Sequence, residues 1–219
     1  MSRYSVEDIY CYPGSSVLRN KLGLTDQDQL DQYEAEITAL RLVELQENPI
    51  KGHFDLEHLK QLHFHIFQDV YDWAGEIRTV DISRGASRFA HAQYIESAAK
   101  TLFEKLKKEN WLKGLSIDEF SQKAAHYLSE INVLHPFREG NGRAQRAYIT
   151  QLCKEAGYVL DYSDLEQDEL FDAMKEAFQG DEHKIAQILR ERLTENVELA
   201  KVVEERRGGK TLKVNLDDL

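Results

Sequence analysis

Apolar residues recur at three- and four-residue steps along most of this chain, a spacing that predicts amphipathic helices. Thr25 and Asp26 offer a helix start, and Ser116 with Glu119 has the spacing of a capping box. Gly157 should end a helix, because glycine adopts the left-handed conformation that closes helices. The predicted helices cover residues 25–48, 55–73, 95–110, 116–134 and 143–157, with two or three more between 164 and about 205.

The apolar positions define the faces that two of these helices should bury. They are Leu30, Tyr33, Ile37, Leu40 and Val43 in the segment 25–48, and Leu56, Leu59, Leu62, Ile66 and Phe67 in the segment 55–73. Each set lies along one side of its helix, so we expect both sets to face the core.

The segment "RTVDISRGASRFAHA", residues 78–92, breaks the helical pattern. It alternates short β-forming residues around Gly85, which predicts a small hairpin with that glycine at or near its tip. We therefore expect an all-α fold, a helical bundle with one small β-hairpin flap. Residues 1–205 should form one domain with its core at about 50–160, and residues 206–219 a flexible tail.

Composition and charge narrow the classes of partner. The 219 residues include 28 Lys and Arg against 39 Asp and Glu, a net charge of −11 that repels nucleic-acid backbones and anionic lipids. We therefore expect no direct nucleic-acid partner and no membrane. Cys11 and Cys153 are far apart, which fits two unpaired thiols in a reducing compartment. No signal peptide is evident, so we expect a cytoplasmic protein, with export into a host or recipient cell left open.

The segment "HPFREGNGRAQR", residues 135–146, gathers the candidate chemistry, and we call it the motif segment. Pro136 interrupts one helix, and glycines at 140 and 142 lead into the next, where unsatisfied backbone N–H groups bind anions. Arg143 and Arg146 lie in the first turn of that helix, where cations oppose the helix dipole unless an anion compensates them. This pattern predicts a polyphosphate ligand.

The remaining residues of the motif segment fit transfer chemistry. Glu139 offers a carboxylate beside the phosphate site, the kind of ligand that Mg²⁺ takes together with phosphate oxygens. His135 titrates near neutrality and could deprotonate a hydroxyl nucleophile. Phe137 should face inward and hold the loop to the core. A base, a metal ligand and an anion cradle so close together favour phosphoryl or nucleotidyl transfer.

The motif segment resembles the signature of Fic-domain proteins, His-Pro-Phe-x-Asp/Glu-Gly-Asn-Gly-Arg-x-x-Arg, at every specified position. The stretches "YCYPGSSVLRNKLGL", "DVYDWAGEIRTVDI" and "FSQKAAHYLSEINVLHPF" are similar to this family too, so the likeness covers about residues 4–200. The resemblance implies a Fic fold and transfer of AMP from ATP to a Ser, Thr or Tyr hydroxyl of a target protein. Type II topoisomerase subunits and small GTPases are targets that it admits.

The resemblance also implies a role for each motif residue. His135 would be the catalytic base and Glu139 the Mg²⁺ ligand. Outer phosphates would be bound by Arg143 and Arg146, the latter at the γ-phosphate. The ATP-binding anion hole would consist of Gly140, Asn141 and Gly142, with the Asn141 side chain at the α-phosphate.

Two further features of the family bear on substrate choice. A target segment would pair with the flap at Ser87, Arg88 and Phe89. Doc-type kinases of this family carry lysine where this chain has Gly142, so the glycine favours adenylylation over phosphorylation.

Many Fic proteins are inhibited by a helix with the pattern Ser/Thr-x-x-x-Glu-Gly/Asn, whose glutamate pairs with the second motif arginine. The nearest match here is "TENVEL", with Thr194 and Glu198 in the expected C-terminal helix, but Leu199 replaces the Gly or Asn. The chain therefore resembles the class inhibited by a separate small antitoxin protein. We expect it to be the toxin of a toxin–antitoxin pair, with an antitoxin glutamate on Arg146.

Alternative interpretations stay open at the level of the sequence. The same fold could transfer UMP, phosphocholine or phosphate, the chain could be a non-catalytic ATP-sensing module, or it could be a scaffold with a decayed motif. A metal site is another reading of His53, His58, His63 and His65, but their spacing differs from His-Glu-x-x-His, so we interpret them as surface or core histidines.

Overall fold

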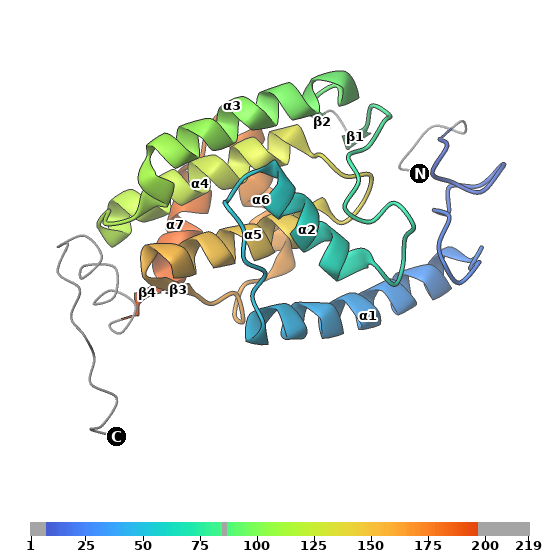
Figure 1. The fold of residues 1–219 in the computed structure, drawn as a ribbon, viewed down its shortest axis with the longest axis horizontal. Coiled ribbons are helices and arrows are strands. Elements are labelled where there is room, and N and C mark those ends of the chain that lie inside the picture. The colour runs from blue at the N-terminus through green and yellow to red at the C-terminus, as the bar shows by residue number, and fades with distance from the viewer. Residues whose placement is uncertain (1–7, 85–86, 197–219) are drawn as a thin grey trace.

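The computed structural model describes residues 8–84 and 87–196, which form a bundle of helices with two very small sheets (Figure 1). The fold predicted from the sequence is confirmed. The α-helices are α1 (Gln27–Glu47), α2 (Leu56–Phe67), α3 (Ile95–Lys108), α4 (Ile117–Leu134), α5 (Asn141–Ala156), α6 (Gln167–Phe178) and α7 (His183–Arg192), with short 3₁₀ turns at Ala92–Tyr94 and Asn110–Leu112.

Helices α4 and α5 form the centre of the bundle. The neighbours of α4 are α3, α5, α6 and α7, while α5 also packs against α2, and α2 packs against α1 (Figure 1). The larger apolar core is formed by side chains from the helices α2 through α7. A second, smaller core lies between α1, α2 and the segment at 11–18. None of the helices in the described part of the chain is long and apolar enough to cross a lipid bilayer.

Local sequence signals set the ends of the central helices, as predicted. The Ser116 hydroxyl accepts the Glu119 N–H, and the Glu119 carboxylate accepts the Ser116 N–H, so the capping box is formed. Gly157 closes α5 in the left-handed conformation, with φ 93°. At the start of α1, the Asp26 side chain accepts the Gln29 N–H.

Two helix predictions need correction. Leu40 and Val43 of α1 are 61% and 53% exposed, so the predicted apolar face of this helix is not buried as a whole. Helix α1 lies at the edge of the bundle and packs mainly on α2, which covers only a narrow strip of its surface. Helix α2 ends at Phe67 instead of continuing to residue 73, because the Val70 N–H bonds to the carbonyl of Phe67, three residues back, in a tighter turn.

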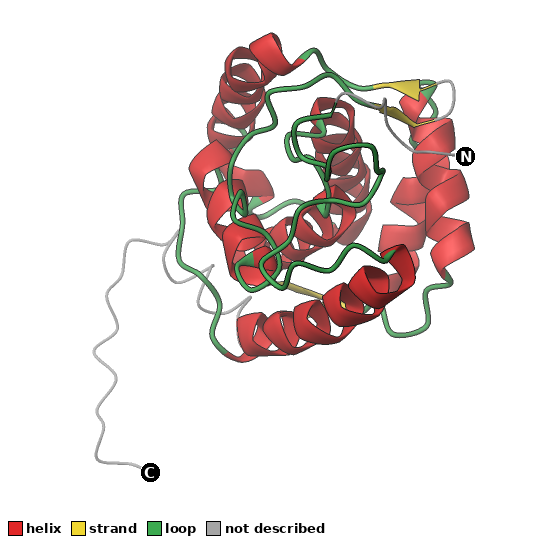
Figure 2. Cartoon of the chain, turned by 90° about the vertical axis from the view of Figure 1, so that its right-hand side faces the viewer, coloured by secondary structure: helices red, strands yellow, loops and turns green. Residues whose placement is uncertain are grey.

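The predicted hairpin is present, and a second sheet was not predicted. Strands β1 (Ser83–Arg84) and β2 (Ser87–Arg88) pair antiparallel at the rim of the bundle, as Figure 2 shows, while Gly85 lies outside the described residues. Strands β3 (Tyr158–Leu160) and β4 (Leu193–Glu195) pair at the end of α5.

Strand β4 changes the interpretation of the inhibitory pattern. The sequence analysis expected Thr194 in a helix, but this residue lies in strand β4, opposite Val159. Glu198 and the predicted tail at 206–219 lie outside the described residues.

Candidate active site

The loop between α4 and α5 contains the first half of the motif segment, residues 135–140, and turns sharply at both ends. His135 follows α4 in the left-handed region, with φ 43°, and Gly140 precedes α5 with φ 78°. A Cβ atom on Gly140 would lie 2.2 Å from the ring of Phe67, so both the backbone angle and the space require glycine. No side chain caps the start of α5, which leaves its first N–H groups available to an anion.

The side chain of Asn141 closes this loop from inside. Its Oδ1 accepts the N–H of Phe137 at 2.9 Å, and its Nδ2 donates to the Phe137 carbonyl at 2.7 Å. The side chain is buried, so the structure places it toward the core and not toward the expected α-phosphate. The part of Asn141 that remains for an anion is its backbone N–H, and its place in the ATP site stays a prediction.

His63 of α2 supports the loop from below. Its Nδ1 accepts the Gly75 N–H at 2.8 Å, so its Nε2 carries the proton and donates to the Glu139 carbonyl at 2.9 Å. The imidazole stacks on Phe137 with ring centres 3.8 Å apart, which confirms that Phe137 faces inward. Burial lowers the pKa of His63 to about 3, so the ring is neutral. His63 is therefore a core residue, in agreement with the expectation that these histidines lie on the surface or in the core.

Among the described residues, one ring nitrogen of His135 has no hydrogen-bond partner and is suited to a base. Its Nδ1 lies 3.1 Å from the carbonyl of Asn132, which can only accept, so Nδ1 carries the proton and Nε2 holds the lone pair. The ring is stacked on Phe89, with centres 3.7 Å apart and planes at 15°. Burial under this ring, together with the positive charges of Arg78 and Arg84, lowers the pKa of His135 to about 3. The imidazole is therefore in its basic form at neutral pH.

The two motif arginines differ in their partners. Arg143 points to α1, where its Nη2 lies 2.5 Å from a Glu34 oxygen and its Nη1 donates to Thr38 at 3.1 Å. Its guanidinium also covers the ring of Phe67 at 4.6 Å. The hydroxyl of Tyr71 donates to the other oxygen of Glu34. The structure thus engages Arg143 with α1, and its place at the outer phosphates stays a prediction.

Arg146 has no such carboxylate. No ion pair to it is found within residues 8–84 and 87–196, and burial, with the charge of Arg143 nearby, lowers its pKa. A half-buried guanidinium without a counter-ion is costly, which favours an anionic ligand at this position. Gly142 lies beside it: a Cβ atom there would be 3.2 Å from Nη1 of Arg146, so a larger residue would crowd this cation.

Glu139 supplies the acidic group of the site. Its Oε1 accepts the Gly140 N–H at 3.0 Å, which turns the carboxylate back over the loop at the start of α5. The residue is half-buried. A hard oxygen beside uncapped N–H groups is the donor set that Mg²⁺ uses with a bound phosphate, so these residues fit the ion.

The hairpin brings one of its three predicted residues against the base. Phe89 stacks on His135 and touches Phe178 of α6 edge-on at 5.9 Å. Ser87 and Arg88 lie in β2 and pair with Arg84 and Ser83 of β1, and the Arg88 side chain is exposed. Their place in target binding stays a prediction.

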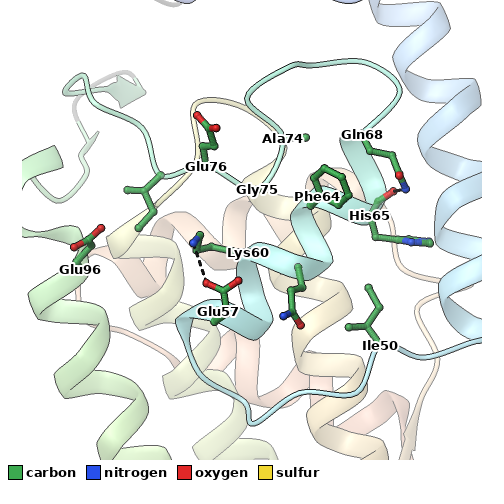
Figure 3. Close-up of a pocket in the computed structure, with 12 residues that line it drawn as sticks. Ile50, Glu57, Lys60, Phe64, His65, Gln68, Ala74, Gly75, Glu76 and Glu96 are labelled. Carbon is green, nitrogen blue, oxygen red and sulfur yellow. Dashed lines mark hydrogen bonds and ion pairs between the residues drawn. The ribbon is translucent and has the colours of Figure 1, made fainter.

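A groove of about 690 Å³ lies on the other side of α2, between this helix, the chain around Gly75 and the start of α3 (Figure 3). Phe64, Lys60 and Glu76 are among its lining residues, and none of the predicted site residues is. The candidate active site is the surface of the motif segment, because the uncapped helix start is there together with Arg146, which has no ion pair within the described residues.

Comparison with known proteins assigns the family. The family model described as Fic/DOC family matches residues 53–153. The probable protein adenylyltransferase Fic of Escherichia coli is 41% identical over 80% of this chain and 86% of the relative. The chain belongs to the Fic/DOC family. Protein adenylyltransferase VbhT of Bartonella schoenbuchensis is 44% identical over 86% of this chain, which spans only 39% of that longer relative.

A solved structure shows the same fold with a nucleotide. The BepC protein of Bartonella tribocorum, with bound AMPPNP, superposes with a TM-score of 0.83 at 27% identity. The alignment covers 88% of this chain and 99% of that one. The Fic fold implied by the motif segment is thus confirmed.

Proposed function

We propose that this chain is a protein adenylyltransferase, which transfers AMP from ATP to a Ser, Thr or Tyr hydroxyl of a target protein. The observation that carries the proposal is Arg146, a half-buried cation without an ion-pair partner in the described residues, beside an uncapped helix start. The relatives in Escherichia coli and Bartonella schoenbuchensis that bear this activity in their names support it, as does the AMPPNP in BepC.

The geometry suits this transfer. Nε2 of His135, whose lone pair is fixed by the proton on Nδ1, would accept the proton of the target hydroxyl. The hydroxyl oxygen then forms a bond to the α-phosphorus, the bond from that phosphorus to the bridging oxygen breaks, and pyrophosphate leaves. Backbone N–H groups at 141 and 142 would stabilise the charge on the α-phosphate, and Arg146 would hold the γ-phosphate.

A magnesium ion would complete the site. Glu139 would hold it together with phosphate oxygens, where Mg²⁺ neutralises charge on the leaving pyrophosphate. Arg143 would assist at the outer phosphates from its position between Glu34 and Thr38.

We also propose a toxin role with a separate inhibitor in the cytoplasm, where ATP is available. A glutamate from a small antitoxin protein would pair with Arg146, take the place of the γ-phosphate and prevent productive ATP binding. The unpaired state of Arg146 within the described chain supports this arrangement. Addition of such a protein should stop transfer by the wild type.

Labelled ATP tests the activity. A cell lysate is incubated with the purified chain and ATP labelled at the α- or the γ-phosphate. Label from the α-phosphate alone should enter protein, and His135→Ala should abolish it, while His53→Ala, at an exposed histidine outside the site, should not. Label from the γ-phosphate alone would indicate a kinase, and ATP binding without transfer a sensor. Either result would refute the proposal.

A further inference from the structure

Arg78 is a buried arginine next to the catalytic loop that the mechanism above does not use. It lies at the start of the hairpin segment, residues 78–92, and is 1% exposed. Burial lowers its pKa, yet its planar guanidinium is one of the few groups that stay charged in such a place. A buried charge needs compensation from neighbouring dipoles or ions.

The guanidinium is compensated by carbonyl groups. Nε donates to the His135 carbonyl at 2.8 Å, Nη1 to Val80 at 2.7 Å and Nη2 to Ala90 at 2.5 Å. Nη2 also reaches the Leu134 carbonyl, at 3.4 Å. The nearest carboxylate is that of Asp81, at 3.9 Å from Nη1.

The carboxylate of Asp81 is engaged elsewhere. One of its oxygens, Oδ2, lies 2.7 Å from Nδ1 of His91. The other, Oδ1, accepts the Ala92 N–H at 2.7 Å. The carbonyls are therefore the main partners of Arg78.

These carbonyls belong to the two ends of the hairpin and to the turn after α4. Val80 and Ala90 are the two ends of the hairpin, and His135 bears the proposed base. The backbone of Arg78 adds a fourth link, because its N–H donates to the Pro136 carbonyl at 2.9 Å. One side chain thus connects both ends of the hairpin to the turn that orients the imidazole.

We propose that Arg78 is a positioning residue that fixes the hairpin relative to His135, so that a target segment on the hairpin presents its hydroxyl to the imidazole. This role rests on the proposed transfer to a protein hydroxyl. His135 adopts φ 43°, which is unfavourable for a residue with a side chain, and its carbonyl is held by Arg78. Loss of the contact would let this turn relax and the hairpin move away.

Lysine cannot replace this arginine. The guanidinium presents five N–H groups in a rigid plane and reaches carbonyls on several sides at once, whereas an ammonium concentrates its donors at one point. Arg78→Lys keeps the charge near His135 and removes the fork. It therefore separates the positioning role from a purely electrostatic one.

The test measures transfer, nucleotide binding and access to the hairpin. In Arg78→Lys we expect AMP transfer from α-labelled ATP to lysate proteins to fall by about 100-fold, the scale of a misplaced reacting group. Binding of AMPPNP, measured by calorimetry, should stay as in the wild type, since the phosphate contacts are untouched. Trypsin should cut after Arg84 and Arg88 faster than in the wild type, because the hairpin is no longer anchored at its ends.

Arg138→Lys is the matched control. Arg138 is also 1% exposed, and its guanidinium is held by Asp8 at 2.7 Å in the N-terminal segment. Its replacement should leave the cleavage after Arg84 and Arg88 slow. If Arg138→Lys exposes these bonds as strongly as Arg78→Lys does, the effect is general loosening and the proposal fails. It also fails if Arg78→Lys transfers AMP like the wild type.

Hydrogen exchange on the wild type covers the case in which Arg78→Lys does not fold. The Arg78 N–H is bonded to Pro136, in the loop after α4, and the Ala90 N–H to Val133, at the end of α4. If the arginine makes these contacts one unit, both amides should show one common opening free energy after each exchange rate is corrected for its intrinsic rate. Much faster exchange at Ala90 would overturn the proposal. Cleavage and exchange do not depend on catalysis, so a wild type without AMP transfer would refute the proposed function alone.

Discussion

The inner and outer sides of the motif loop differ in how fully their polar atoms are bonded. On the inner side, the Asn141 amide pairs with the backbone of Phe137, and the Glu139 carbonyl accepts from His63. On the outer side, no partner is found for Nε2 of His135 or for the Arg146 guanidinium within the described residues. Bonded polar atoms stabilise a loop, and unbonded ones await a ligand or a substrate.

The same contrast separates two chemically similar histidines. Burial lowers the pKa of both His63 and His135 to about 3. Both ring nitrogens of His63 are bonded, so it can only support the loop, whereas His135 keeps one nitrogen for a proton. A lowered pKa alone would not have distinguished the base from the support.

The largest effect is expected from the arginine pair. Arg146→Gln should weaken ATP binding by about 10- to 100-fold, the value of a charge-assisted contact of roughly 1.5–3 kcal/mol. Arg143→Gln should weaken it less, because Arg143 is already engaged with Glu34 and Thr38. Calorimetry with AMPPNP measures both. A stronger loss in Arg143→Gln would mean that nucleotide breaks the contact with Glu34 and that the contrast between the arginines is false.

A smaller effect, on stability, is expected from the histidine pair on α2. His63→Gln should lower the free energy of unfolding by about 1–3 kcal/mol, because the buried Gly75 N–H and Glu139 carbonyl lose well-placed partners. His65→Gln is the matched control: this half-exposed residue bonds to the Arg41 carbonyl and lies 3.8 Å from the Glu44 carboxylate, and its loss should cost less than about 1 kcal/mol. Urea unfolding measures the free energy of unfolding of both variants. An equal loss in His63→Gln and His65→Gln would show that His63 has no special structural role.

A still weaker signature is expected in the pH dependence. The pKa of each buried histidine is lowered from 6.5 to about 3, so in this range the unfolded chain binds more protons than the folded one. Stability from these groups is therefore complete above pH 6.5 and is lost as pH falls toward 3. For the same reason kcat/KM for transfer should show no inflection near 6.5 from His135. An inflection near pH 6.5 would contradict the lowered pKa of His135.

Local signals predicted much of the fold and of the site. The capping box at Ser116 and the glycine at 157 set the ends of the central helices, and the motif segment alone led to the family. These features are encoded by residues a few positions apart, so a sequence displays them directly. The inward position of Phe137 followed from the same stretch.

The contacts that the sequence did not reveal join distant segments of the chain. Arg143 pairs with Glu34, more than a hundred positions away, and no local pattern announces that contact. Arg78 and His63 were not singled out as supports of the site, because their partners are backbone carbonyls or N–H groups, which carry no sequence signature. The pairing of β3 with β4 likewise joins the end of α5 to the end of α7. Three-residue strands are too short to show periodicity.

The smallest expected effect concerns an internal inhibitor. The family pattern requires its Ser or Thr and its Glu one turn apart on a helix, but Thr194 lies in β4, bonded across the sheet opposite Val159. A helix cannot include a residue in that extended conformation, so the spacing to Glu198 loses its meaning. Glu198→Gly should therefore transfer AMP at the wild-type rate, measured with α-labelled ATP and the purified chain. A clear rise would show that this chain restrains itself, and the proposed antitoxin would then lose its main support.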